Sequence, residues 1–148
     1  VEHLSHPNGW WRDTAQKLII LRKDGKSVVP SLEKMAREGG SGLGRVHALW
    51  TLEGLEATKP DLLADKLGDA DHRVRMAAVR ISEPFLTDGD KTVISSFKRL
   101  EKETKGRGRG QLRQRLFGPQ VVDYLGDWLQ TIGSKPRTPF GRVPTGQI

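Results

Sequence analysis

Apolar residues recur at the 3.6-residue spacing of an α-helix through the first hundred residues, interrupted by glycine, proline and aspartate. The first such stretch predicts a helix that begins after Asn8 and stops at Asp24-Gly25. Trp11, Ala15, Leu18, Ile19 and Arg22 share one stripe of this amphipathic helix, and its apolar members are expected to face the core. A second stretch, from Ser27 to Gly39-Gly40, has Pro30 in its first turn and predicts a second helix, antiparallel to the first.

The same arrangement of two helices is predicted twice more. Leu43 to Ala57 and Lys59 to Leu67 would form the second pair, and Asp71 to Leu86 and Lys91 to Glu103 the third. Pro84 removes one backbone donor and predicts a kink near Ile81 without ending the helix. We therefore expect an all-α domain over residues 1–104, made of helical hairpins at about 8–40, 43–68 and 71–104.

A short motif marks the first helix of each predicted hairpin. It is an arginine followed three residues later by alanine, in the pairs Arg12 and Ala15, Arg45 and Ala48, and Arg75 and Ala78. The arginines stand 33 and 30 positions apart, and self-similarity at such a period is typical of stacked helical repeats. The alanines would let neighbouring first helices approach closely, and each arginine would reach an aspartate or a carbonyl of the next turn or repeat.

At these positions the chain resembles a HEAT repeat, whose outline is visible in Asp71-His72-Arg73-Val74-Arg75-Met76-Ala77-Ala78. His6 to Gln16 and Arg45 to Leu55 are similar to the HEAT segment of large planctomycete-type multidomain proteins that join a sugar-dehydrogenase-like propeller to a cytochrome c domain. This resemblance covers about residues 1–86 and implies a solenoid that acts as a spacer or interaction surface. Haem and redox chemistry reside in other domains of that family, so the resemblance implies neither an activity nor a cofactor here.

The chain departs from the family after Leu86, where a basic stretch containing Gly106-Arg107-Gly108-Arg109-Gly110 takes the place of another repeat helix. Alternating glycine predicts a flexible linker over 105–118. A last helix over 119–133 is predicted from the apolar stripe of Val121, Val122, Leu125, Trp128, Leu129 and Ile132. We expect this stripe to cap the last hairpin, with dimerisation through the same face as the competing use. Residues 134–148, rich in proline and glycine, predict an extended tail.

The charge is distributed unevenly along the 148 residues, which carry a formal net charge of +7. Residues 1–90 hold 13 basic and 14 acidic side chains, whereas residues 91–115 hold 9 basic and 2 acidic ones. This local excess is the candidate binding surface for nucleic acid, because clustered cations neutralise phosphates. Its proposed contact residues are Lys98, Arg99, Lys102, Arg107, Arg109, Arg113 and Arg115. A solvated basic face and docking to an acidic protein are the competing interpretations.

Other candidate chemistry is weaker. The chain has no cysteine, which excludes disulfides, thiolate metal sites and thiol nucleophiles. A metal site could be imagined from His3, His6, His47 and His72, but surface or capping roles account for them better. The stretch Gly40-Ser41-Gly42-Leu43-Gly44 lacks the preceding strand and the Lys-Ser/Thr ending of a phosphate loop, and we expect a flexible loop between helices there. Of the two adjacent tryptophans, Trp11 is expected in the core together with Trp50, and Trp10 on the surface. No set of nucleophile, base and orienting group can be assembled.

We therefore expect a protein that is not an enzyme and holds no metal or cofactor. Its first expected role is binding an unknown protein partner through a concave surface formed by the second helices, and the alternative is nonspecific nucleic-acid binding through 91–115. The longest apolar run, Leu18 to Leu21, is far below the ~18 residues of a membrane span. Val1 in place of methionine suggests a trimmed chain or a fragment. If the chain is expressed by itself, we expect a cytoplasmic protein. If it is part of the larger family protein, we expect it to be exported.

Overall fold

The computed structural model describes residues 1–105, and all of the regular elements in that range are helical. The predicted helix 119–133 and the flanking segments 106–118 and 134–148 lie outside it. The α-helices are α1 (Gly9–Leu21), α2 (Val29–Glu38), α3 (Gly42–Gly54), α4 (Pro60–Lys66), α5 (His72–Ile81), α6 (Glu83–Thr87) and α7 (Lys91–Lys105). Two short 3₁₀ helices, η1 (Glu2–Ser5) and η2 (Gly25–Val28), precede α1 and α2. The all-α prediction is confirmed.

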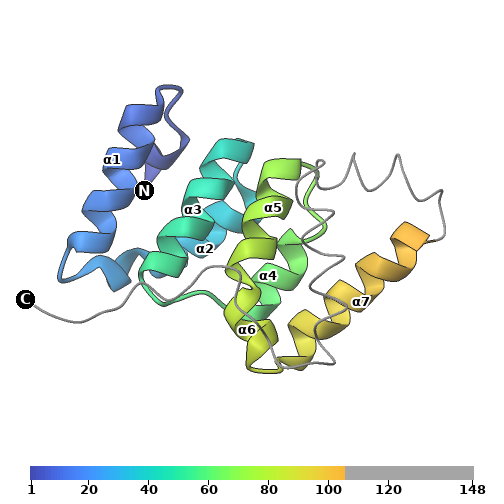
Figure 1. Ribbon diagram of the computed structural model, residues 1–148. Coiled ribbons are helices and arrows are strands. Elements are labelled where there is room, and N and C mark those ends of the chain that lie inside the picture. The colour runs from blue at the N-terminus through green and yellow to red at the C-terminus, as the bar shows by residue number, and fades with distance from the viewer. Residues whose placement is uncertain (106–148) are drawn as a thin grey trace, which may run out of the picture.

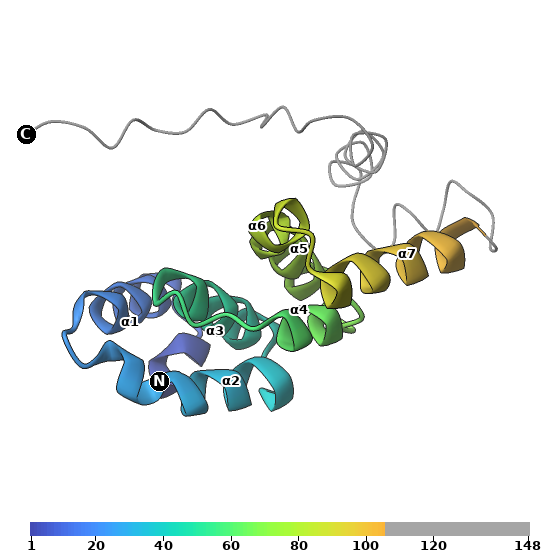
Figure 2. The ribbon, with the colours of Figure 1, turned by 90° about the horizontal axis from the view of Figure 1, so that it is seen from below.

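The helices form two rows that run along the molecule (Figures 1 and 2). In the first row α3 lies between α1 and α5, and in the second α4 contacts both α2 and α7. Buried leucines between the rows form one continuous core, which includes Leu32, Leu49, Leu52, Leu62, Leu63 and Leu67. Burial of these side chains supplies the main driving force for this arrangement.

The packing of neighbouring helices differs from the predicted hairpins. Instead of packing on the helix before it, each second helix packs on the first helix of the following pair, α2 on α3 and α4 on α5. The connection between α2 and α3 is only Gly39 to Ser41, and so short a loop keeps the two helices side by side. Helix α1 packs chiefly on α3 and η1, and η1 inserts the fully buried Leu4.

The predicted helix boundaries are mostly confirmed. Asn8 caps α1 by accepting a hydrogen bond from the Trp10 amide at 2.9 Å, and Gly39 ends α2. The predicted continuous helix Asp71 to Leu86 is wrong, because α5 ends at Ile81 and α6 starts at Glu83. Pro84 stands in the first turn of α6, and its ring and missing amide hydrogen oppose continuation of α5.

Two predicted core residues of α1 are also misplaced. Trp11 is 45% exposed and Leu18 is 59% exposed, whereas Trp50 is partly buried against the core as expected. Ala15 and Ile19, the other apolar members of the predicted stripe, do pack against the core. Both pairs have helical spacing, so periodicity alone did not distinguish the inner one from the outer one.

Candidate interaction surfaces

The repeated arginine plays the same structural part in all three repeats. Arg12 Nη1 donates to the carbonyl of His6 at 2.6 Å, and Arg75 Nη1 donates to that of Asp69 at 2.6 Å. Arg45 Nη1 donates to Gly39 O at 2.5 Å, again six residues upstream. Each guanidinium therefore fastens the loop before its own helix, and the N-cap side chain always stands four residues before the arginine, as Asn8, Ser41 and Asp71.

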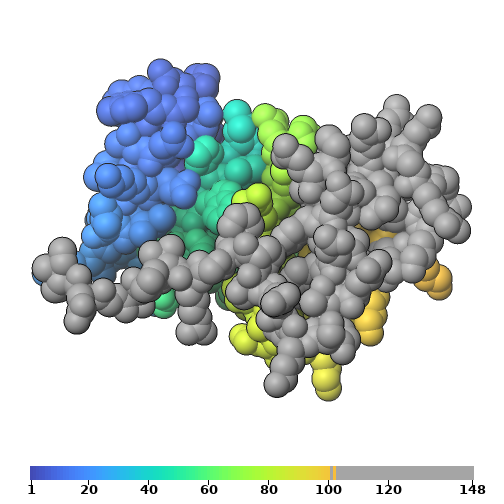
Figure 3. Space-filling view, in the orientation of Figure 1, coloured from blue at the N-terminus to red at the C-terminus, as the bar shows by residue number. Residues whose placement is uncertain are grey.

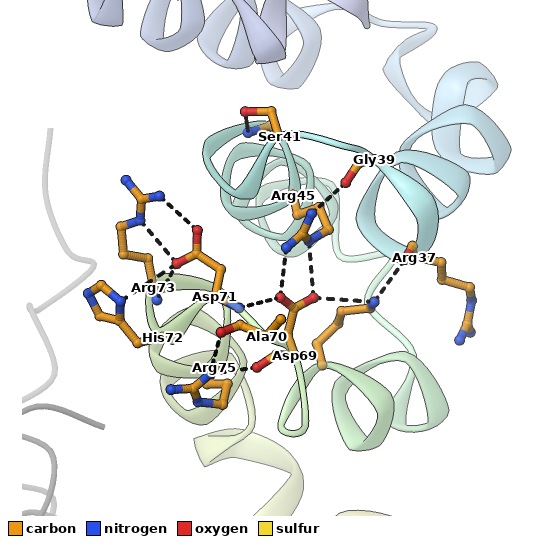
Figure 4. A network of polar contacts seen from close by, with 12 residues as sticks. Arg37, Gly39, Ser41, Arg45, Asp69, Ala70, Asp71, His72, Arg73 and Arg75 are labelled. Carbon is orange, nitrogen blue, oxygen red and sulfur yellow. Dashed lines mark hydrogen bonds and ion pairs between the residues drawn. The ribbon is translucent and has the colours of Figure 1, made fainter. Parts of the chain in front are cut away.

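Asp69 joins two repeats through a buried ion pair (Figure 4). Its side chain is 6% exposed and accepts from Arg45 Nε at 3.0 Å and Nη2 at 2.8 Å. Lys66 Nζ lies 3.5 Å from the same carboxylate and donates to Arg37 O at the end of α2. Burial opposes ionisation, but hydrogen bonds from Arg45 and the Asp71 amide and the charges of Arg45 and Lys66 hold the pKa of Asp69 below its ordinary value.

The side chain of Asp71 caps the N-terminus of α5. It accepts from the Arg73 amide at 2.9 Å and from the Arg73 guanidinium at 2.7 Å, and this pairing with Arg73 lowers its pKa to about 2. Asp90 likewise caps α7, accepting from the Val93 amide at 2.9 Å. The carboxylates of Asp71 and Asp90 are thus occupied by structural partners.

The glycine-containing stretch before α3 forms the N-cap and first turn of that helix. A Cβ on Gly42 would lie 1.8 Å from Asp71 Oδ2, and one on Gly44 would lie 2.2 Å from Ser5 Oγ. These glycines therefore admit the close approach of α5 and η1. Sequence reasoning assigned this stretch to a flexible loop, and the only signal against that assignment was Ser41 as an N-cap candidate.

His47 connects α3 to α1. Its Nε2 accepts from Arg12 Nε at 3.2 Å, so its proton lies on Nδ1 and is donated to Gln16 Oε1 at 2.8 Å. Burial and the Arg12 charge lower the pKa of His47, while Asp13 opposes them. His3 and His6 stack on each other with ring centroids 6.3 Å apart and lie beside Trp11. Within residues 1–105, no cluster of three or more histidine and carboxylate side chains could hold a metal ion.

The basic face of α7, defined as Lys91, Lys98, Arg99 and Lys102, is exposed. Lys91, Lys98 and Lys102 project within about 40° of one another, opposite the buried Val93 and Phe97. None of these four cations forms an ion pair with a side chain of residues 1–100. Of the seven proposed contact residues, Lys98, Arg99 and Lys102 lie on this exposed surface, whereas Arg107, Arg109, Arg113 and Arg115 lie outside the described range.

The outer face of α1, defined as Trp10, Trp11, Leu18 and Leu21, holds every large exposed hydrophobic side chain in residues 1–105. The exposed fractions are 64% for Trp10, 45% for Trp11, 59% for Leu18 and 70% for Leu21. The four lie within an arc of about 100°, and α1 stands at one end of the row α1, α3, α5 (Figure 3). A shallow hollow beside it is lined by Asp13, Gln16, Lys17, Ile20 and Leu21.

Sequence reasoning missed this face because it assigned Trp11 and Leu18 to the core. The available signal was that α1 is apolar on two sides, with Ala15 and Ile19 on one and tryptophan and leucine on the other. A helix that is apolar on two sides is normally covered on both.

The surface of the second helices is polar. Lys59 pairs with Glu33 at 2.7 Å, and Arg37 pairs with Asp61 at 2.5 Å and lies 3.9 Å from Asp65. Apolar anchors for a partner are therefore found on α1 and not on the expected concave surface. Among the helices of residues 1–105, none has both the length and the apolar character needed to cross a bilayer.

A comparison with protein-family models found no match, and neither did comparisons with curated proteins and with solved structures.

Proposed function

We propose that this chain is a non-enzymatic interaction module built as a short HEAT-like solenoid. Two stacked rows of helices and the arginine that recurs in all three first helices support the architecture. The carboxylates at the helix starts are occupied by caps and ion pairs, which favours a binding role over catalysis.

The proposal of protein binding rests on the outer face of α1. Tryptophan is enriched among interface hot spots, and large hydrophobic side chains exposed together mark interaction sites, whereas isolated surface hydrophobics are ordinary. Four such side chains on one helix expose an apolar area on the order of a few hundred Å². A helical partner fits this surface, because Trp11, Thr14, Leu18 and Leu21 alternate spacings of three and four residues.

Photo-crosslinking in the cell that makes the protein tests this role. A benzoylphenylalanine replacing Leu18 should form an adduct with a protein that mass spectrometry can identify. The same probe replacing Ser31, an exposed residue of α2, is the matched control and should form none. Absence of a protein adduct at position 18, with normal folding by circular dichroism, would contradict the proposed function.

Nonspecific nucleic-acid binding is a second candidate, favoured by the exposed cations of the basic face of α7. Fluorescence anisotropy with a short DNA duplex should then show affinity that falls steeply between about 50 and 200 mM salt. The triple change Lys91→Gln, Lys98→Gln and Lys102→Gln should flatten that dependence. Binding that is absent, or insensitive to salt, excludes this candidate and leaves protein binding untouched.

A further inference from the structure

Helix α1 is covered by a neighbouring first helix on only one side. Helix α3 has α1 on one side and α5 on the other, whereas α1 contacts α3, η1 and η2 within residues 1–105. Its outer face nevertheless has the residue spacing of a helix-packing seam, Trp11, Thr14, Leu18 and Leu21. We infer that the outer face of α1 binds the same face of a second copy of this chain, antiparallel, about a two-fold axis beside Ala15. This inference rests on the proposed role in protein binding and names its partner.

The apolar side chains are arranged so that the face complements itself. The aromatic pair, Trp10 and Trp11, lies at the start of α1, and the aliphatic pair, Leu18 and Leu21, lies at its end. Rotation about an axis beside residue 15 lays each Trp11 against the partner copy's Leu18 and each Trp10 against its Leu21. In a two-fold interface the same patch must serve both subunits, and this distribution meets that condition.

Charge on the rim indicates the same axis independently. Asp13 and Lys17 are exposed on one edge of the outer face, and residue 15 is again their midpoint. An antiparallel arrangement therefore brings each Asp13 carboxylate beside the second copy's Lys17 ammonium. A parallel two-fold arrangement would put this edge of the two copies on opposite sides of the seam, so the Asp13 and Lys17 pairs would not form.

The hollow beside the seam provides the last element of fit. It is lined by Ile20 and Leu21 at the C-terminal half of α1, with Asp13 and Lys17 at its edge. Trp10, 64% exposed at the N-terminal end, projects on the side of the helix where the hollow lies. In the antiparallel pair each Trp10 meets the hollow of the other copy. A nucleic acid fits this face poorly, since the exposed charges beside it balance, Asp13 with Lys17 and Arg22 with Asp24.

The area of the face predicts a weak, reversible dimer, because stable interfaces bury about 800 Å² per partner. Sedimentation velocity of the full chain from about 1 to about 100 µM should show a monomer–dimer equilibrium with a Kd of roughly 10 µM. Leu18→Glu should weaken it at least about tenfold, whereas Ser31→Glu, with the same charge change on α2, should not. Lys17→Asp should weaken it, and adding Asp13→Lys should restore it.

Engineered cysteines test the orientation cleanly, because the chain has none of its own. Thr14→Cys, beside the axis, should form a disulfide with itself on mild oxidation. Trp10→Cys alone should not, but a mixture of Trp10→Cys and Leu21→Cys chains should form the mixed disulfide. Self-linking of Trp10→Cys would overturn the antiparallel arrangement.

The remaining outcomes distinguish self-association from the binding of another protein by the outer face of α1. A monomer over the whole concentration range overturns self-association, and so does a dimer that resists Leu18→Glu but dissociates with Leu125→Glu in the predicted helix 119–133. If the position-18 photo-adduct then contains another protein, the proposed interaction role stands without the dimer. If it contains nothing, both fall.

Discussion

The carboxylate of Asp69 balances two cations in the polar network between the rows. Arg45 is 14% exposed and Lys66 is 7% exposed, and both face Asp69 while donating to backbone carbonyls on their other side. A buried ion pair adds little net stability over an apolar replacement, but removal of one partner leaves the other charge uncompensated. Asp69 is therefore the residue on which the junction between the second and third repeats depends most.

Asp69→Ala should lower the free energy of unfolding by about 3 kcal/mol, because Arg45 and Lys66 would remain buried without their counter-charge. Urea denaturation measures the change. Asp65→Ala is the control, since Asp65 also contacts Lys66, at 3.1 Å, but is 52% exposed; its loss should cost less than about 1 kcal/mol. Equal effects of the two substitutions would contradict this account.

His47 makes stability depend on pH. Burial and the charge of Arg12 hold the pKa of His47 below its ordinary value of 6.5, so the unfolded chain binds this proton more readily than the folded one. Stability is therefore complete above pH 6.5 and falls as the pH drops below it, toward the lowered folded pKa. Urea midpoints measured between about pH 7.5 and 5.5 should fall for the native chain and fall less for His47→Gln.

At the scale of elements, the start of α3 is where three segments meet. Ser41 caps the helix, Gly42 lies against Asp71 at the start of α5, and Gly44 lies against Ser5 of η1. Spacing in the sequence shows where a helix starts, but it does not show which neighbour comes within contact distance of its first turn. That explains why the N-caps Asn8 and Asp71 were predictable and the role of the glycines was not.

Gly42→Ala should destabilise the fold by about 1–3 kcal/mol, although alanine in place of helical glycine ordinarily stabilises a helix by about 1 kcal/mol. The reason is the 1.8 Å approach of the new Cβ to Asp71 Oδ2, which would displace a capping carboxylate. Gly40→Ala offers the comparison, because nothing lies within 4 Å of its Cβ. Thermal unfolding of the two variants measures the difference. A Gly42→Ala protein more stable than the Gly40→Ala protein would contradict the prediction.

The helical content and the spacing of the arginines were predictable because each depends on local sequence. The arginine contacts were predicted only in part: Arg45 reaches Asp69 of the next repeat as expected, but the carbonyl that all three arginines share lies in the loop before their own helix and not in the next turn or repeat. The orientation of α1 was not, since both of its stripes, Ala15 with Ile19 and Trp11 with Leu18, have helical spacing. Only the position of α3 determines which stripe is buried. The same limit applies to the partner of α2, which is set by the short connection to α3.

For the whole molecule, an uneven distribution of burial predicts uneven local stability. No residue of α1 is fully buried, whereas α3 holds Ala48, Leu49, Thr51 and Leu52 in the core between its neighbours. Amide hydrogens of α1 should therefore exchange faster than those of α3 in dilute protein. Hydrogen–deuterium exchange read by mass spectrometry checks this, and equal protection of the two helices would contradict it.

Each of the three arginines bonds to the carbonyl six residues before it. The contacts that hold each loop to its first helix therefore lie within one short segment of the chain. Duplication of a gene segment of 30 to 33 codons would copy the N-cap residue, the loop and the arginine together. The local geometry of the new repeat would then be determined by its own sequence. Only the surfaces between repeats, such as Asp69 against Arg45, would then remain to be adjusted by later substitutions. Arrays of this kind can therefore lengthen or shorten during evolution by whole units.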